Sequence, residues 1–361
     1  MPHNNLPLRV LLVGPNPWPL GGQAVQLHRL LARLRTNRSI EVSFLAINPH
    51  FVRGFAWLQE VKFLRTIANM LVYYCGLLWA VPRTDVVHIF SSAYWSFFIA
   101  SSPAILVARV FRKRIVLNYR SGEGPNHLRQ WRRFAPKAMR LAHAIVVPSD
   151  YLVGVFAQYD LHARAIRNFV ELEKIPYRER RTFKPIFLAN RLLWPLYNVG
   201  CAIRAFQQVQ KEYPDARLIV AGDGSERPNL ERLVAELALR NVQFRGELTQ
   251  EEMWAAYSEA DIYLNSPNID NMPGSILEAF AAGTPVISTA AGGIPLIVAD
   301  GESGLLSPVG NSAALAANAL RILRNPEIGV ALTLRARQEV ISKYTWEAVQ
   351  DQWLAVYRPE S

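Results

Sequence analysis

A loop that leads into a predicted helix start near residue 274 contains the side chains best suited to chemistry. Asp270 stands in this loop, and Glu278 follows eight positions later in the first turns of the helix. Backbone amides at a helix start have no partner within the helix and are suited to bind a diphosphate. The amides at this start belong to Gly274, Ser275, Ile276 and Leu277. Since a carboxylate in such a site can accept hydrogen bonds from both hydroxyls of a ribose, the pattern indicates a sugar nucleotide site.

Both acids also have a purely structural interpretation. A carboxylate in the first turns of a helix interacts favourably with the helix dipole, which would explain Glu278. An acid in a loop can cap a turn, which would explain Asp270. The residues of this loop alone leave both interpretations open.

Short apolar runs that alternate with helical patterns surround this loop. Runs typical of strands lie at residues 8–14, 41–46, 86–90, 115–118 and 144–148, and again at 185–190, 217–221, 242–244, 261–265, 285–288 and 304–306. Such alternation is typical of an α/β protein with parallel sheets. We therefore predict two Rossmann-like, doubly wound domains with an interdomain cleft, where ligands would bind at the carboxyl ends of the strands.

A charged, proline-containing segment near the middle of the chain is typical of a domain boundary. We predict an N-terminal domain over residues 1–170, a linker over 171–184, a C-terminal domain over 185–340 and a terminal helix within 341–361.

The motifs of the second half resemble those of the family 4 glycosyltransferases, which are retaining enzymes with the GT-B fold. Asp270 and Glu278 match the family's acidic-x7-Glu motif. Further matches follow the family's order at Ala221–Gly224, Phe244–Gly246, Ala260–Tyr263, Gly292–Pro295 and Gly301–Leu306. The first half matches more thinly, at Gly21-Gly22, Asp85–His88 and Val147–Ser149.

The resemblance implies a retaining glycosyltransferase that moves a sugar from a UDP- or GDP-sugar to an acceptor bound by the N-terminal domain. Asp270 would hydrogen-bond the transferred sugar, and Arg191 would neutralise the leaving diphosphate. Glu278 would hold the ribose, while the amides of residues 274–277 would bind the diphosphate. The terminal helix would cross back to the N-terminal domain.

Three glycines complete the donor site that the resemblance implies. Gly21 and Gly22 would let a loop of the first domain approach the phosphate or the acceptor, because glycine has no Cβ. Gly222 has two interpretations, as a donor-binding residue and as a turn glycine.

Two positions depart from the family's pattern. A lysine usually follows the arginine by a few residues, and none follows Arg191 here, so Tyr197 or Asn198 would have to supply a neutral donor. Arg120 stands where the family often has a histidine, and it would act in catalysis by turning toward the diphosphate. These departures keep an alternative open, a catalytically impaired sugar-nucleotide-binding or scaffold protein.

The composition excludes several other classes of protein. The chain has 361 residues, of which half are apolar and 19% are charged, so we expect a globular protein. Cys75 and Cys201 are its only cysteines, too few for a disulfide framework or a thiolate zinc site. Without an Asp-x-Asp motif or a histidine cluster, we expect neither a metal nor a cofactor. No signal peptide is visible, so we expect a cytoplasmic protein, peripheral on the inner face of the membrane.

Charge is distributed unevenly between the halves. Residues 1–182 carry 25 Lys and Arg against nine Asp and Glu, a net charge of +16, whereas residues 183–361 carry 15 against 20, a net charge of −5. We expect the basic half to face an anionic membrane surface that carries a glycan or glycolipid acceptor. A solvated basic surface is the alternative, and nucleic acid is not expected because no dedicated nucleic-acid motif is present.

One segment of the first half contains no charge. Thr66 to Pro82 spans seventeen residues, the short limit for crossing a bilayer, so we expect a buried helix. The alternative is a helix that dips into a membrane interface with Tyr73, Tyr74 and Trp79 at the level of the headgroups.

Overall fold

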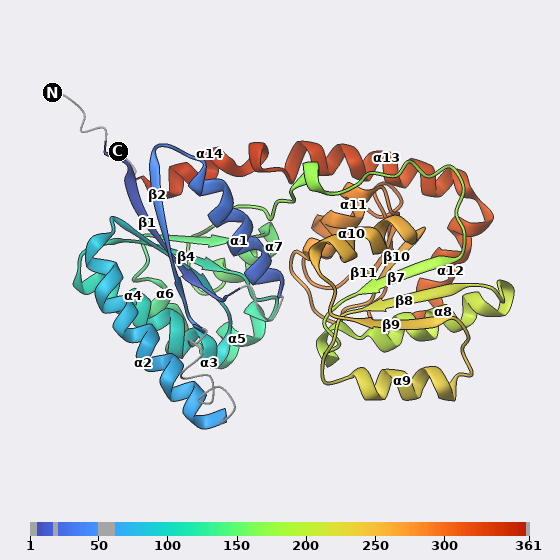
Figure 1. The fold of residues 1–361 in the computed structure, drawn as a ribbon, viewed down its shortest axis with the longest axis horizontal. Coiled ribbons are helices and arrows are strands. Elements are labelled where there is room, and N and C mark those ends of the chain that lie inside the picture. Colours follow the sequence, from blue (N-terminus) through green and yellow to red (C-terminus); the bar gives the residue numbers. More distant parts are fainter. Residues whose placement is uncertain (1–5, 17–20, 50–61, 359–361) are drawn as a thin grey trace. The chain divides into compact units, whose positions relative to one another are not determined.

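Contacts between residues divide the chain into two compact units. The structure is a computed structural model that describes residues 6–16, 21–49 and 62–358. The first unit comprises residues 1–166 and 350–361, and the second comprises residues 167–349. Figure 1 labels most of the helices and strands of both units.

The first unit is built on a six-stranded parallel sheet in the order β2-β1-β3-β4-β5-β6. Its strands are β1 (Leu8–Gly14), β2 (Ile40–Ala46), β3 (Val86–Ser91), β4 (Arg114–Tyr119), β5 (Ala144–Val147) and β6 (Ala163–Ala165). Its helices are α1 (Gly22–Arg35), α2 (Lys62–Ala80), α3 (Tyr94–Ser96), α4 (Ser102–Val110), α5 (Gly124–Gln130), α6 (Ala135–Met139) and α7 (Asp150–Ala157). A 3-10 turn, η2 (Val81–Arg83), and a π-helical turn, η3 (Phe97–Ser101), complete it.

Both faces of this sheet are apolar and covered, as a parallel sheet requires. Leu11 and Val13 of β1 belong to the core cluster that includes α2 and α4. On β3, His88 stacks on Trp353 of the terminal helix α14 (Trp346–Tyr357), with ring centroids 5.1 Å apart. His88 Nδ1 also lies 2.8 Å from the Tyr357 hydroxyl, so this histidine packs the core.

The second unit contains another six-stranded parallel sheet, in the order β12-β11-β10-β7-β8-β9. Its strands are β7 (Ile186–Asn190), β8 (Arg217–Ala221), β9 (Val242–Gly246), β10 (Ile262–Asn265), β11 (Val286–Thr289) and β12 (Leu305–Ser307). Its helices are α8 (Val199–Glu212), α9 (Arg227–Glu236), α10 (Gln250–Glu259), α11 (Gly274–Ala282), α12 (Ser312–Arg324) and α13 (Pro326–Lys343). Three 3-10 turns accompany them, η4 (Leu172–Lys174), η5 (Pro195–Tyr197) and η6 (Ile294–Leu296).

Alternate residues of β7 point to opposite faces of the second sheet and pack in two separate hydrophobic cores. Phe187 and Ala189 of β7 pack in a cluster with α8 and α12, whereas Leu188 packs in a cluster with α11 and α13. The chain reverses its direction of travel across the sheet between β7 and β10. Loops that follow such neighbouring strands leave a ligand-sized space at the carboxyl edge, which makes this switch point the expected binding position.

The predicted α/β class with two doubly wound sheets is confirmed. Each of the eleven predicted strands is present, with ends displaced by two residues at most. Strand β6 is not predicted, because Ala163–Ala165 is short and has no β-branched residue or alternating apolar pattern.

The residues predicted as a linker, 171–184, are part of the second unit. Arg180 is buried, and its guanidinium donates hydrogen bonds of 2.7–3.0 Å to the carbonyl oxygens of Tyr257, Ala260, Ala282 and Gly283. These carbonyls end α10 and α11, where unpaired oxygens and the helix dipole favour a cation. Burial lowers the pKa of Arg180 to about 9.

Helix α2 is buried on one side and exposed on the other. Tyr73 is buried and donates a 2.7 Å hydrogen bond to the Ala100 carbonyl, and Tyr74 donates one of 3.0 Å to Ile99. The helix expected in this segment is present as α2, and both tyrosines tie it to η3, which does not fit the alternative that places them at the level of membrane headgroups. Trp79 is exposed. In the described part of the chain, no helix has the length and apolar character needed to cross a bilayer.

Candidate active site

Loops at the switch point of the second sheet bring the predicted donor residues together. Arg191 directly follows β7, and Asp270 lies in the loop between β10 and α11. The Arg191 guanidinium forms an ion pair with the Asp270 carboxylate, and both side chains are almost buried, at 12% and 13% exposed. The same guanidinium donates a 3.1 Å hydrogen bond from Nη1 to the Ser275 hydroxyl in the first turn of α11.

The charge of Arg191 is stabilised where it lies. Burial opposes a charged guanidinium, but Asp270 and the neighbouring tyrosines outweigh burial, so the pKa of Arg191 is raised above its usual value. The guanidinium carbon also lies 4.1 Å from the ring centroid of Tyr197, a cation–π distance. Arg191 is thus a fixed cation beside the helix start.

The two residues proposed to replace the missing lysine have different surroundings. Tyr197 contacts Arg191 through its ring. Asn198 instead donates a 3.0 Å hydrogen bond to Asn268, in a left-handed backbone conformation with φ of 44°. Of the two, only Tyr197 lies against the arginine.

A buried tyrosine that the sequence analysis overlooks links the donor residues. The Tyr257 hydroxyl accepts a 2.8 Å hydrogen bond from Asn190 and donates one of 2.8 Å to the Ser275 carbonyl. It also lies 3.5 Å from Glu278 Oε2. Burial, with the Glu278 carboxylate nearby, raises the pKa of Tyr257 well above its usual value, so the phenol stays protonated as a donor. The position of Asn190 at the end of a predicted strand, beside Arg191, is the signal that could have pointed to this network.

The start of α11 has the features of an anion site. Pro273 is its N-cap residue and makes no side-chain capping hydrogen bond. Gly274 and Ser275 are half-buried, whereas Ile276 and Leu277 turn their side chains into the core. The Ile276 amide donates a 3.3 Å hydrogen bond to the Pro273 carbonyl. The amides of Gly274 and Ser275 precede it and have no partner within the helix. They lie at the positive end of the helix dipole, so this first turn can bind phosphate oxygens.

Closely packed glycines hold the Asp270 loop in place. A Cβ on Gly292, which has φ of 54°, would lie 2.0 Å from the Asp270 carbonyl oxygen, and one on Gly293 would lie 2.3 Å from that of Asn271. Gly293 also donates a 3.0 Å hydrogen bond to the Asp270 carbonyl. The Gly292-Gly293 pair therefore positions the acid, a role that the sequence analysis does not assign.

Gly222 also has a packing role. It has φ of 119°, and a Cβ there would lie 2.2 Å from the Arg191 carbonyl oxygen. Its own amide donates a 2.6 Å hydrogen bond to Gly246. The structure thus supports the interpretation of Gly222 as a turn glycine, because its amide already donates a hydrogen bond within the protein.

Three predicted site residues belong to the first unit. Arg120 follows β4, donates a 3.4 Å hydrogen bond to Asn118 and lies 5.5 Å from the ring centroid of Phe90. Burial lowers the pKa of Arg120 to about 9, so it remains a cation at neutral pH. Gly21 is the N-cap residue of α1 and Gly22 its first residue, and a Cβ on either would meet no atom of the described residues within 4 Å.

The donor set favours binding of a diphosphate by arginine and helix amides. Among the described residues, no three His, Cys, Asp or Glu side chains are grouped so that they could hold a metal ion. Asp270 and Glu278 can accept hydrogen bonds from hydroxyl groups, while Arg191 and the first turn of α11 can bind anionic oxygens.

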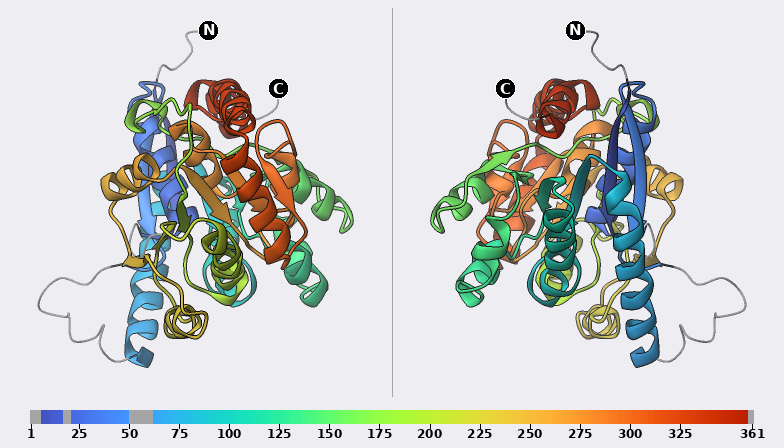
Figure 2. Two further views of the ribbon diagram at one scale, coloured as in Figure 1. Left: turned by 90° about the vertical axis from the view of Figure 1, so that its right-hand side faces the viewer. Right: turned by 90° about the vertical axis from the view of Figure 1, so that its left-hand side faces the viewer.

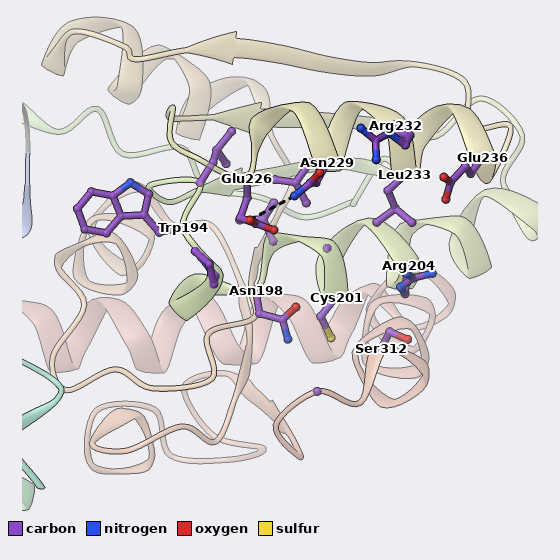
Figure 3. Close-up of a pocket in the computed structure, with 16 residues that line it drawn as sticks. Trp194, Asn198, Cys201, Arg204, Glu226, Asn229, Arg232, Leu233, Glu236 and Ser312 are labelled. Carbon is purple, nitrogen blue, oxygen red and sulfur yellow. Dashed lines mark hydrogen bonds between the residues drawn. The ribbon is translucent and has the colours of Figure 1, made fainter. Parts of the chain in front are cut away.

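A separate cavity of about 530 Å³ lies between α8 and α9. Figure 3 shows Arg204 and Asn198 on one side of it and Glu226, Arg232 and Glu236 on the other. Its lining mixes both signs of charge and includes neither Asp270, Arg191 nor Glu278.

Comparison with known proteins agrees with this arrangement. Residues 184–325 match the family described as Glycosyl transferases group 1. The chain is 33% identical over 158 residues to a 2-deoxystreptamine N-acetyl-D-glucosaminyltransferase of Niallia circulans, covering 42% of this chain and 40% of the relative. It is 31% identical over 179 residues to a phosphatidyl-myo-inositol mannosyltransferase of Mycobacterium leprae, covering 49% and 47%. The chain thus spans about half the length of these relatives or less.

A solved structure resembles the chain over nearly its whole length. HepE of Anabaena, crystallised with UDP and glucose, matches with a TM-score of 0.71 at 16% identity, covering 96% of this chain and 98% of that one. Residues 184–325 are therefore similar to the group 1 glycosyl transferases, and the two parallel sheets of the chain have the GT-B fold.

Proposed function

We propose that the protein is a retaining glycosyltransferase that moves a sugar from a nucleoside diphosphate to an acceptor. The observation that supports it most strongly is the Arg191, Asp270 and Ser275 cluster at the start of α11. A cation beside the amides of a helix start suits a leaving diphosphate, and the two acids suit the hydroxyls of sugar and ribose.

In the proposed reaction, the residues act mainly by electrostatics. Arg191 and the amides of Gly274 and Ser275 would stabilise the negative charge that builds up on the diphosphate as the glycosidic bond breaks. Asp270 would give up part of its ion pair with Arg191 and would hydrogen-bond the transferred sugar. Glu278 would orient the ribose. The donor phosphate itself can accept the acceptor's proton, so no side-chain base is required, and we expect no metal.

We propose that the donor is a UDP-sugar and that the acceptor is a glycan or glycolipid. HepE of Anabaena was crystallised with UDP, which supports UDP over GDP. A relative whose name includes phosphatidyl-myo-inositol supports a lipid-linked acceptor. The basic first half of the chain would suit the charge of such an acceptor.

A thermal-shift screen followed by a product assay tests the proposal. We expect a UDP-sugar to raise the melting temperature, because a ligand that binds the folded state stabilises it. The same sugar should then appear on an acceptor with its anomeric configuration kept, and a chelator should leave the rate unchanged. Binding without transfer to any glycan or glycolipid would favour the alternative, a non-catalytic sugar-nucleotide-binding protein. No shift with any sugar nucleotide would contradict both.

A further inference from the structure

The first unit carries a cluster of exposed aromatic rings that the proposed sugar transfer does not use. Trp95, Phe98 and Trp131 lie with ring centroids 5.4–6.0 Å apart, and Phe134 follows in the chain. Trp95, Phe98 and Phe134 are 66%, 53% and 70% exposed. We call these four residues the aromatic face. Large apolar side chains exposed as a group, rather than singly, usually mark a surface that contacts another phase or partner.

The aromatic face rests on a rigid base. Trp131 packs on the buried His127, whose Nδ1 lies 2.9 Å from the Tyr119 hydroxyl. Tyr94 begins α3 with φ of 56°, a conformation that a bulky residue rarely adopts. The π-helical turn η3 follows directly and carries Phe98. A strained backbone such as that of Tyr94 persists only where the surrounding structure enforces it. Since Tyr94 directly precedes Trp95, the fold itself holds this part of the aromatic face in place.

Positive charge surrounds these rings. Arg132 and Arg133 are exposed between Trp131 and Phe134, and Arg129 is exposed one turn earlier. Between residues 86 and 149 the chain has ten Lys and Arg but a single acid, Glu123. The partner of this surface must therefore be both apolar and anionic.

Helix α2 adds an apolar surface beside the aromatic face. Tyr73 and Tyr74 bind it to Ile99 and Ala100 of η3, and the right-hand view of Figure 2 shows α2 (light blue) beside α4 (teal). Over residues 66–80 of this helix, the exposed large side chains are apolar: Ile67, Leu71, Val72, Leu78 and Trp79. A helix that is apolar on its exposed side as well as its buried side is expected to be covered by another apolar medium.

We propose that the aromatic face and the exposed side of α2 dock on an anionic lipid bilayer. The rings of Trp95, Phe98 and Phe134 would lie at the boundary between headgroups and acyl chains, where aromatic side chains are favoured. Arg129, Arg132 and Arg133 would pair with lipid phosphates. The protein would thus be held at the surface without crossing it.

Charge argues against the two other occupants. A second copy of this chain, docked through the same face, would bring the same arginines together without acids to neutralise them. A nucleic acid would match the arginines, but its phosphates would leave the uncharged side of α2 uncovered. The bilayer satisfies both features, and the proposal goes beyond sugar transfer because docking needs no substrate.

Co-sedimentation of the full chain with vesicles tests the proposal. We expect binding to vesicles of phosphatidylcholine mixed with phosphatidylglycerol, little binding to phosphatidylcholine alone, and weaker binding as salt rises. Arg132→Gln/Arg133→Gln should bind the anionic vesicles about thirtyfold more weakly, because two charges near the surface are lost. Trp95→Ala/Phe98→Ala should bind about tenfold more weakly or worse, because both rings leave the interface.

Matched controls separate docking from a general effect of charge or hydrophobicity. Arg35→Gln/Arg38→Gln removes the same charge from exposed positions at the end of α1 and just after it. Leu334→Ala/Ile341→Ala removes exposed apolar side chains from α13. Both should bind like the wild type. Equal binding to neutral vesicles, or equal losses in the controls, would overturn the proposal. So would a dimer that Trp95→Ala/Phe98→Ala disperses, or an oligonucleotide complex that replaces vesicle binding.

Discussion

At the scale of single residues, Arg191 is the centre of the candidate site. It reaches Asp270, Ser275 and the ring of Tyr197 at once, so three side chains fix one planar guanidinium. A diphosphate that enters the site meets a cation whose orientation is already set. Little reorganisation is then needed when charge develops on the leaving group, which is the condition for effective electrostatic catalysis.

Replacing Arg191 by lysine keeps the charge but removes this fixed geometry. A lysine cannot make the forked contact with Asp270 and Ser275, nor stack on Tyr197. We expect Arg191→Lys to lower kcat about tenfold to a hundredfold, equivalent to one lost charge-assisted hydrogen bond. Steady-state kinetics checks this, with Arg217→Lys, an exposed ion-paired arginine on β8, as the control. Equal rates in Arg191→Lys and the wild type would remove Arg191 from the mechanism.

Tyr257 tests the network beneath the site. Tyr257→Phe removes the hydroxyl that joins Asn190, the Ser275 carbonyl and Glu278. We expect a loss of about 1–3 kcal/mol in stability, because the buried Asn190 amide loses a partner, together with weaker UDP binding. Chemical denaturation and calorimetry measure the two effects. Tyr213→Phe removes the hydroxyl of a half-buried tyrosine outside this network and should change neither quantity. Full UDP affinity in Tyr257→Phe would show that Tyr257 is structural only.

At the scale of elements, α11 and the loop before it place Asp270 and Ser275 next to Arg191, which follows β7. Gly292 and Gly293 pack on the backbone of Asp270 and Asn271 so closely that no side chain fits. The loop, the helix start and the glycine turn after β11 therefore behave as one assembly.

Gly292→Ala should break this assembly. Its matched control is Gly310→Ala, because Gly310 also has a positive φ, of 75°, yet a Cβ there meets no atom within 4 Å. Strain in φ alone costs about 1 kcal/mol, which both variants share. We expect Gly292→Ala to lose further stability and most UDP affinity, as thermal unfolding and calorimetry would record. Identical behaviour of the two alanine variants would mean that the contact with Asp270 is unimportant.

The sequence allows the elements to be predicted better than their contacts. Alternating apolar runs locate eleven strands, and the spacing of Asp270 and Glu278 locates the helix start of the site. Tyr257, Gly292 and Gly293 are missed because their roles depend on contacts between segments that are distant in the chain. The hydrogen bonds of Tyr73 and Tyr74 to η3 are missed for the same reason, although a buried helix is expected there.

At the scale of the whole molecule, buried histidines make the first unit sensitive to acid. Burial lowers the pKa of His88 to about 3 and of His127 to about 4, from an ordinary value of 6.5. The unfolded chain therefore binds protons that the folded chain does not. The free energy of unfolding has its full value when the pH is above the histidine pKa of the unfolded chain. It falls as the pH drops below that pKa, by about 2 kcal/mol per buried histidine at about pH 5.

Thermal unfolding as a function of pH checks this expectation. The melting temperature should fall between neutral pH and mildly acidic pH, and the fall should be shallower in His88→Gln and His127→Gln. His162→Gln replaces an exposed histidine and should keep the slope of the wild type. An unchanged slope in both variants of the buried histidines would assign the acid sensitivity to other groups.

The central claim is that the start of α11 and its neighbours bind a nucleoside diphosphate, and titration calorimetry with UDP tests it most directly. We expect UDP to bind the wild type and to bind Glu278→Gln about tenfold to a hundredfold more weakly, because the ribose loses charge-assisted hydrogen bonds. Glu236→Gln, which changes the cavity between α8 and α9, should bind like the wild type. Full affinity in Glu278→Gln, or loss of affinity in Glu236→Gln instead, would contradict the account.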